Sequence, residues 1–243
     1  MSEAWRQIGE ARAGGTLLIA DHASAYVPGD VDLGIDLALL TNHIAIDIGV
    51  AEVAALLVES GAVDAAILGG VSRLVVDCNR EDDAPGALPI ASDGHAVPGN
   101  ALGDAGREAR LARFFRPYHA HIAATIAAQR PAMILSLHSF TPSLESHPDQ
   151  ARPWHVGVLY NEDDRLAGAA IAALEAEGMT VGDQQPYSGK LLNATMNRHA
   201  EGNGIPYVGI EMRQDLVGDA AGQALFAERL GRMCKNVALN ITP

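Results

Sequence analysis

Short apolar segments alternate with longer alanine-rich segments along the chain, and this alternation constrains the fold more than any other feature of the sequence. The short segments are typical of buried strands, and the longer ones repeat their apolar residues at the period of an amphipathic helix. We expect strands at residues 16–20, 65–68, 74–77, 133–137, 156–159 and 207–211, helices at 37–60, 103–129, 164–177 and 222–238, and long loops at 81–100 and 139–153. This alternation predicts an α/β layer fold, organised as a single domain over residues 1–243.

The charge balance and composition exclude several classes of protein. The chain has 17 Lys and Arg residues against 30 Asp and Glu residues, whereas a dedicated nucleic-acid-binding protein needs clustered Lys and Arg to contact phosphates. Two cysteines, Cys78 and Cys234, are too few for a disulfide framework or a cysteine-rich zinc site. The sequence contains no long apolar run typical of a membrane span, and its first residues lack the apolar core of a signal peptide. We therefore expect a cytoplasmic protein whose partner is a small-molecule substrate, not a nucleic acid or a membrane.

Polar side chains gather where the expected strands end. Asp21 and His22 follow the first strand, His138 and Ser139 follow the fourth, and Glu211 ends the sixth. In an open α/β sheet, ligands bind at the edge formed by the strand ends. Two histidines at separate strand ends with a nearby carboxylate are typical of a catalytic zinc site, beside which a further glutamate can act as general base. A single histidine at a strand end is more typical of a structural residue, so spacing alone leaves both interpretations open.

Two further groups extend this pattern. Asp77, Asn79 and Arg80 follow the third expected strand, and an Asn-Arg pair suits a carboxylate because arginine can bind it through two hydrogen bonds. His43 and Asp47 lie on the first expected helix. These groups predict a pocket in which a metal site and a carboxylate-binding site adjoin.

Other chemistries have weaker support in the sequence. Ser24, Ser139 and Ser188 are candidate nucleophiles, but none lies in a Gly-x-Ser-x-Gly segment. The two Gly-Gly pairs are not followed by the Gly-Lys-Ser/Thr of a phosphate-binding loop. Cys78 has no basic neighbour in the sequence to activate it, which favours a buried structural thiol.

Several segments resemble one known family and follow one another in that family's order. They are DHASAYVP (21–28), HIAIDIG (43–49), SRLVVDCNR (72–80), VPGN (97–100), LHSFTP (137–142), PWHVGVLY (153–160), PYSG (186–189) and GIEMRQDL (209–216). The chain resembles the N-formylglutamate amidohydrolase family, itself distantly similar to zinc carboxypeptidases and aspartoacylase-type deacylases. This resemblance implies a three-layer fold of the zinc-carboxypeptidase, or phosphorylase/hydrolase-like, kind, with a mixed, mostly parallel central sheet flanked by helices.

The resemblance also implies a ligand set for one zinc ion (Zn2+) per chain. His22 and His138 match the two histidine ligands. The relatives take their third ligand from a glutamate three residues after the first histidine, but Ala25 stands there in this chain. We expect Asp47 to be the third ligand, with His43 as the second choice. A histidine-rich site with one carboxylate would also accept other divalent first-row metals, such as cobalt, nickel or manganese.

Further roles are implied by the same resemblance. Glu211 is expected to be the general base, and Asn79 and Arg80 are expected to hold the substrate's carboxylate. Arg73 is the cation expected to stabilise the oxyanion that forms during catalysis. The family often has Glu where Asp21 stands, so we assign Asp21 no role. The remaining expected substrate-binding residues are Ser139, Tyr187, Ser188 and Arg213; a structural role for Arg213, and a plain surface turn at Tyr187 and Ser188, are equal alternatives.

These observations predict a zinc-dependent hydrolase that cleaves the amide of an N-formyl or N-acyl amino acid, with N-formyl-L-glutamate, giving formate and L-glutamate, as the leading substrate. One alternative is a metal-dependent amidase or peptidase with another small N-acyl or peptide substrate, because loops can change specificity on one fold. A second is a non-catalytic protein that binds an acidic metabolite. Ligand binding that survives chelation and loss of the Glu211 carboxylate would indicate this last class.

Overall fold

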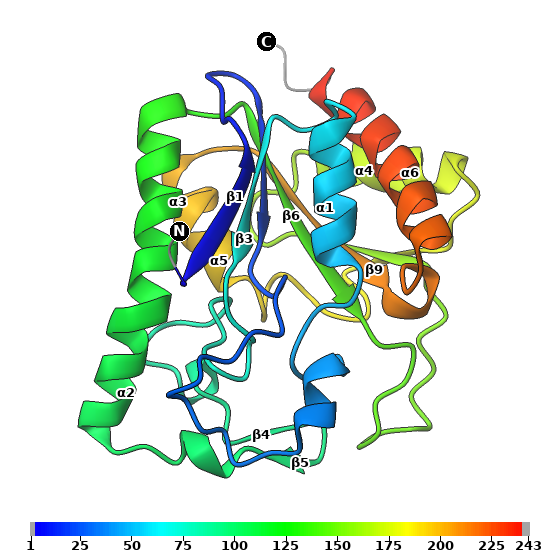
Figure 1. Ribbon diagram of the computed structural model, residues 1–243. Coiled ribbons are helices and arrows are strands. Elements are labelled where there is room, and N and C mark those ends of the chain that lie inside the picture. Colours follow the sequence, from blue (N-terminus) through cyan, green and yellow to red (C-terminus); the bar gives the residue numbers. More distant parts are fainter. Residues whose placement is uncertain (1–2, 240–243) are drawn as a thin grey trace.

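A mixed seven-stranded sheet forms the centre of the computed structural model, which describes residues 3–239 (Figure 1). The strands lie in the order β1-β3-β2-β6-β9-β7-β8, and neighbours are parallel except at β1–β3 and β7–β9. Their bounds are β1 Trp5–Gly9, β2 Thr16–Ala20, β3 Ala65–Gly69, β6 Met133–Phe140, β7 Val156–Leu159, β8 Val181–Asp183 and β9 Tyr207–Arg213. Strands β4 (Ala91–Ser92) and β5 (His95–Ala96) form a separate pair.

Helices cover both faces of the sheet. Helices α1 (Val50–Glu59), α4 (Ala167–Ala176) and α6 (Ala220–Ala238) pack on one face, and α3 (Arg116–Gln129) and α5 (Ala194–His199) lie on the other (Figure 1). Helix α2 (Asp104–Arg110) continues into α3 through a π-helical turn, η4 (Leu111–Phe115). Short 3₁₀ segments complete the set: η1 Leu37–Thr41, η2 Pro85–Ala87, η3 Pro98–Asn100, η5 Glu201–Asn203 and η6 Gln214–Leu216.

The core divides into two layers because successive strand residues point to opposite faces. In β6, Ile134 belongs to the buried cluster on the α3 side, and Leu135 belongs to the cluster on the α1 and α6 side. All eight residues of β6 are buried. The expected three-layer α/β fold with a mixed, mostly parallel sheet is therefore confirmed. No helix between residues 3 and 239 combines the length and apolar composition that a membrane crossing needs.

The strand expected at residues 74–77 is wrong, because this segment folds as a turn. Leu74, Val75 and Val76 are buried as a strand would be, which is why their apolar run was misleading. Their backbone is satisfied by side chains: Asn100 Nδ2 donates to the Leu74 carbonyl at 2.7 Å, and Arg110 Nη1 donates to the Val75 carbonyl at 3.0 Å. A short apolar run indicates that the segment is buried, but its periodicity alone does not distinguish a strand from a buried loop.

The helix expected at 37–60 is also wrong over its first half. The chain forms η1, then a series of turns, and α1 begins only at Val50. Gly49 interrupts the helix, because its φ of 80° is a left-handed conformation, and an added Cβ would lie 2.4 Å from the Val217 carbonyl oxygen. His43 and Asp47 therefore lie in the turns before α1, not on a helix.

Besides the β4–β5 pair and the short 3₁₀ segments, three elements of the described chain were not expected from the sequence: β1, β8 and α5. Strand β1 is an edge strand that is only partly buried, and β8 has three residues, so neither carries a continuous apolar run. Helix α5 has six residues and lacks a side-chain cap. The other expected strands and helices are present, with ends shifted by a few residues.

Candidate active site

A cavity of about 640 Å³ opens at the carboxyl ends of β2, β6 and β9. Its floor holds polar side chains from the ends of these strands, and its walls come largely from the two long loops expected at 81–100 and 139–153. The loops are joined to each other, because the Asp93 carboxylate accepts hydrogen bonds from the backbone nitrogens of Glu145 and Ser146, each at 2.9 Å. The location agrees with the edge at which ligands bind in open α/β sheets.

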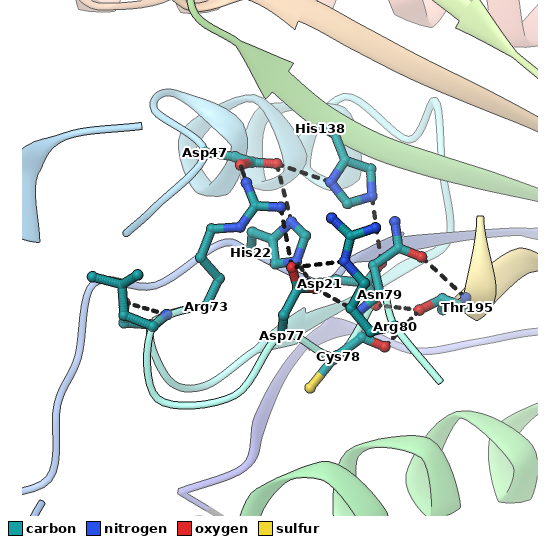
Figure 2. A network of polar contacts seen from close by, with 12 residues as sticks. Asp21, His22, Asp47, Arg73, Asp77, Cys78, Asn79, Arg80, His138 and Thr195 are labelled. Atoms are coloured by element: carbon teal, nitrogen blue, oxygen red, sulfur yellow. Dashed lines mark hydrogen bonds and ion pairs between the residues drawn. The ribbon is translucent and has the colours of Figure 1, made fainter. Parts of the chain in front are cut away.

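His22, Asp47 and His138 meet on the floor of this cavity (Figure 2). Asp47 Oδ2 lies 2.8 Å from His138 Nδ1 and 3.5 Å from His22 Nδ1. One donor atom from each side chain lies within 4.8 Å of the other two, and all three side chains are buried. Asp47 is placed by the turn before α1, where its backbone nitrogen donates to the His22 carbonyl at 3.0 Å. The residues come from three separated parts of the chain.

The second nitrogen of each imidazole faces a carboxylate outside the cluster of His22, Asp47 and His138. His22 Nε2 is hydrogen-bonded to Asp77 Oδ1 at 2.8 Å, and His138 Nε2 faces Asp21 Oδ2 at 3.3 Å. Asp21 is held by two hydroxyl donors, Tyr118 at 2.9 Å and Thr195 at 2.8 Å. Carboxylates that contact the outer nitrogen of a histidine fix its ring orientation and tautomer, an arrangement common around metal ligands.

The charges of this network shift the pKa values of its members. Burial lowers the pKa of His138, but hydrogen bonds to Asp21 and Asp47 outweigh burial and raise the pKa well above its usual value. Burial raises the pKa of Asp47, but the charges of Arg73 and His22 outweigh burial and hold that pKa well below its usual range. The two imidazoles thus lie in a strongly negative environment that favours cations.

Arg73 connects the two sides of the network. Its Nη1 donates to Asp47 Oδ1 at 3.0 Å, and its Nη2 lies 3.5 Å from Asp77 Oδ2. The loop after β3 holds Arg73 in place, because its backbone nitrogen donates to the Ala45 carbonyl at 3.2 Å. Arg73 also lines the cavity, so it contacts Asp47 and contributes a positive charge to the cavity lining.

Glu211 lies beside His138 on the neighbouring parallel strand, at the same register position. Its side chain lines the cavity, and its Oε2 is buried without a hydrogen-bond partner in the described part of the chain. Burial raises the pKa of Glu211 to about 7, although the nearby His138 acts to lower it. A carboxylate whose pKa lies near neutrality is suited to accept and return a proton.

Asn79 and Arg80 are placed on the wall of the cavity by the loop that follows β3. Asn79 Oδ1 accepts a hydrogen bond from the Thr195 backbone nitrogen at 3.1 Å, which leaves the amide NH₂ available to a ligand. Arg80 Nε lies 3.5 Å from Asp77 Oδ2, and its guanidinium is partly exposed. The pair therefore offers hydrogen-bond donors and one positive charge to the cavity.

The structure does not bring every expected residue into the site. Arg213 pairs with Asp215 at 2.8 Å and donates to the Pro153 carbonyl, and neither it nor Ser188 lines the cavity. Ser139 lines the cavity, but its hydroxyl donates to the Ile48 carbonyl at 2.9 Å. His43 lies in the outer, partly exposed wall, where its Nε2 is 3.0 Å from Asp93 Oδ2, and it does not belong to the cluster of His22, Asp47 and His138.

Sequence reasoning missed several members of the network. It gave no role to Asp21, which contacts His138, and it did not connect Tyr118 or Thr195 with Asp21. Arg152, which is buried behind the cavity wall, was also missed. The adjacency of Asp21 to His22 was a usable signal for one of them. The contact between Thr195 and Asp21 joins residues 174 positions apart, so no local pattern could have indicated it.

The donor set fits a divalent metal ion. His22 Nδ1 is buried without a hydrogen-bond partner among residues 3–239, although it points toward Asp47. Ligands of a tetrahedral zinc ion lie on the order of 3.4 Å apart, close to the spacing of these three donors. With both imidazoles neutral, as metal ligands must be, and Glu211 ionised, the carboxylates of Asp21, Asp47, Asp77 and Glu211 outnumber the guanidiniums of Arg73 and Arg80 by two. A dication would offset this deficit of positive charge.

Comparisons with known proteins identify the family and the fold. The family model described as N-formylglutamate amidohydrolase matches residues 15–217. A solved gene product of Agrobacterium tumefaciens is 33% identical, with a TM-score of 0.89 over 96% of this chain and 94% of its own. The N-formylglutamate amidohydrolase of Ralstonia eutropha shares the fold at 18% identity, with a TM-score of 0.72 over 98% of both chains. No curated protein matches the sequence.

Proposed function

The chain belongs to the N-formylglutamate amidohydrolase family, and from this premise we propose that it is a metal-dependent enzyme that releases the acyl group from N-formyl or other N-acyl amino acids. Membership of the family makes it a hydrolase that cleaves amide bonds. Within that class we propose N-formyl-L-glutamate as the first substrate to examine, with formate and L-glutamate as products. The metal that we propose is one zinc ion per chain.

The observation that carries this proposal is the convergence of three kinds of group in one cavity. His22, Asp47 and His138 supply a compact donor set, and Glu211 lies at the register position beside His138 with an unpartnered oxygen among the described residues. Arg80 adds a partly exposed positive charge on the cavity wall. A metal site, a proton acceptor and an anion site are the parts needed to hydrolyse an amide next to a carboxylate.

The chain's own residues divide the remaining tasks. A divalent metal held by the three donors supplies a Lewis acid and lowers the pKa of water at the site. Glu211 takes a proton from the attacking water and then gives it to the leaving amine nitrogen. Asn79 and Arg80 bind the substrate's carboxylate and so orient the acyl group, and the Arg73 guanidinium stabilises the negative charge that develops on the acyl oxygen. Asp21 and Asp77 hold the imidazoles in the orientation that the donor set requires.

The proposal is tested by hydrolysis of N-formyl-L-glutamate by zinc-loaded protein. We expect Glu211→Gln to lower kcat by roughly 10²–10⁴-fold, because the proton acceptor is lost while the three donors remain. Zinc binding, measured by calorimetry, should persist in this variant. The matched control is Glu175→Gln, which alters an exposed glutamate on α4 and should leave kcat unchanged.

Three outcomes would contradict parts of the proposal. Turnover that persists in a chelated sample would reject the metal. A zinc-loaded protein without turnover would reject this substrate and direct the search to other N-acyl amino acids or small peptides. Ligand binding that survives both chelation and Glu211→Gln, with no amide cleaved, would indicate a binding protein in place of an enzyme.

A further inference from the structure

Two buried histidines have no place in the mechanism described above. His119 on α3 and His199 on α5 are 6% and 3% exposed, and neither of them lines the cavity. His119 Nδ1 lies 2.8 Å from His199 Nε2, and the two rings are stacked with their centres 5.1 Å apart. On its other side, His119 Nε2 lies 3.0 Å from the Cys78 carbonyl oxygen. These contacts join two helices to the segment that carries Asn79 and Arg80.

The Cys78 carbonyl fixes the proton positions along this chain of contacts. A carbonyl oxygen can only accept a hydrogen bond, so His119 Nε2 carries a proton and donates to it. Burial lowers the pKa of both His119 and His199 to about 4, so both rings are neutral at pH 7. A neutral imidazole has one donor and one acceptor nitrogen. His119 Nδ1 is therefore the acceptor, and His199 Nε2 donates to it.

His119 is the main donor to the Cys78 carbonyl. The Thr195 hydroxyl also lies near this oxygen, at 3.2 Å, but it lies closer to the Asp21 carboxylate, at 2.8 Å. A hydroxyl has one proton to donate, and a charged acceptor forms the stronger hydrogen bond. Since Thr195 serves Asp21, removal of the His119 imidazole would leave the buried carbonyl without its donor, which is unfavourable.

Helix α5 holds the same segment at a second point. The Thr195 backbone nitrogen donates to Asn79 Oδ1 at 3.1 Å (Figure 2). His199 lies four residues after Thr195, on the same face of the helix. Because α5 has only six residues and no side-chain cap, its position depends on tertiary contacts. The hydrogen bond from His199 to His119 is such a contact, and it ties α5 to α3.

We propose that His119 and His199 are positioning residues, which hold the Cys78 carbonyl and α5 so that Asn79 and Arg80 are directed into the cavity. Their effect on substrate binding rests on the proposed function, in which Asn79 and Arg80 bind the carboxylate. Loss of the pair should therefore weaken substrate binding more than it slows the chemical step. If the two rings only filled space in the core, an apolar ring of similar size would replace either of them without this loss.

The test measures hydrolysis of N-formyl-L-glutamate by zinc-loaded protein. We expect His119→Phe to raise KM by about tenfold and to leave kcat within about threefold, because the buried hydrogen bonds are lost while the metal donors remain. His119→Gln should recover most of this loss, because its amide can still donate to the Cys78 carbonyl. His199→Phe should raise KM by a smaller factor, about threefold. The matched control is His121→Phe, also on α3, whose ring stacks on Trp5; it should change neither value.

Two measurements do not depend on turnover. Nitrogen NMR of the wild-type imidazoles should show the proton on Nε2 in both His119 and His199, and a proton on His119 Nδ1 alone would overturn the proposal. Amide hydrogen exchange reports on the segment directly, because the Asn79 backbone nitrogen donates to Asp77 Oδ1 at 3.0 Å. We expect exchange at residues 77–81 to be about tenfold faster in His119→Phe than in the wild type or His121→Phe.

The outcomes separate this proposal from the proposed function. Faster exchange in His119→Phe, in a protein that hydrolyses no substrate, would support the positioning role while the proposed function fails. Unchanged exchange and unchanged KM in His119→Phe, in a protein with normal turnover, would overturn the positioning role while the proposed function stands. A fall in kcat and zinc affinity with KM unchanged would indicate a general structural role and would also overturn it.

Discussion

At the scale of single residues, the site is a set of charges whose members depend on one another. Asp47 faces both imidazoles, and Asp77 and Asp21 take up the outer nitrogens. The Glu211 Oε2 atom is buried and lacks a hydrogen-bond partner in the described chain. The pKa of Glu211 is raised to about 7 chiefly by burial, so in the metal-free protein its ionisation is coupled to folding.

This coupling predicts the pH dependence of stability in the metal-free protein. The pKa of Glu211 is about 7 in the folded state, above its ordinary value of 4.5. Between pH 4.5 and about pH 7 the folded protein therefore binds more protons than the unfolded chain, and its stability falls as the pH rises through this range. Glu211→Gln removes this dependence. We expect the variant to exceed the wild type in free energy of unfolding by less than about 1 kcal/mol near pH 5 and by roughly 3 kcal/mol near pH 8.

Urea unfolding of the chelated wild type and of Glu211→Gln at the two pH values measures this difference. Glu175→Gln is again the control, and its difference from the wild type should not grow with pH. A gap that stays constant or shrinks from pH 5 to pH 8 would show that Glu211 is ionised in the folded protein at both values.

At the scale of elements, the start of α1 decides where the third donor lies. The expected helix at 37–60 would have placed Asp47 on a helical face, whereas the turn before α1 directs it toward His22 and His138. Gly49 makes this turn possible through its positive φ and through its close approach to the Val217 carbonyl. A break in secondary structure therefore creates the donor set.

We expect Gly49→Ala to destabilise the protein by about 1–3 kcal/mol, because alanine is strained at positive φ and its Cβ would meet the Val217 carbonyl. Zinc affinity should also fall, because Asp47 lies two residues earlier in the same turn. Gly61→Ala is the control: Gly61 has a φ of 68° but no atom within 4 Å of an added Cβ. That variant should lose about 1 kcal/mol and keep its zinc affinity. Equal zinc affinity in both variants would disprove the role of the turn.

At the scale of the whole molecule, the sheet brings together groups that are remote in the sequence. The carboxyl ends of β2, β6 and β9 converge on the cavity, and the two long loops enclose it. The resulting cluster of buried carboxylates is unfavourable unless cations balance it. Metal binding should therefore be linked to the stability of the complete fold.

Zinc should raise the melting temperature of the chelated protein. A free zinc concentration of 100 times Kd would add about 2.7 kcal/mol, or roughly 5–10 °C for a chain of this size. We expect Asp47→Asn and His138→Gln to reduce this shift strongly. His43→Gln should retain it, because His43 lies in the outer wall beside Asp93. Thermal unfolding with and without zinc checks this, and loss of the shift in His43→Gln alone would identify His43 as the third ligand in place of Asp47.

The sequence by itself determined the layer fold and most of its strands and helices, because these follow from local apolar patterns. The same patterns and the family resemblance placed His22, His138 and Glu211 at strand ends. Only the tertiary structure showed that Asp47, and not His43, lies beside His22 and His138, that Asp21 contacts Thr195, that residues 74–77 form a turn and that Arg152 is buried. The physical reason is that the partners in these contacts lie far apart along the chain. Their energies depend on charges and hydrogen bonds that exist only after the sheet has formed.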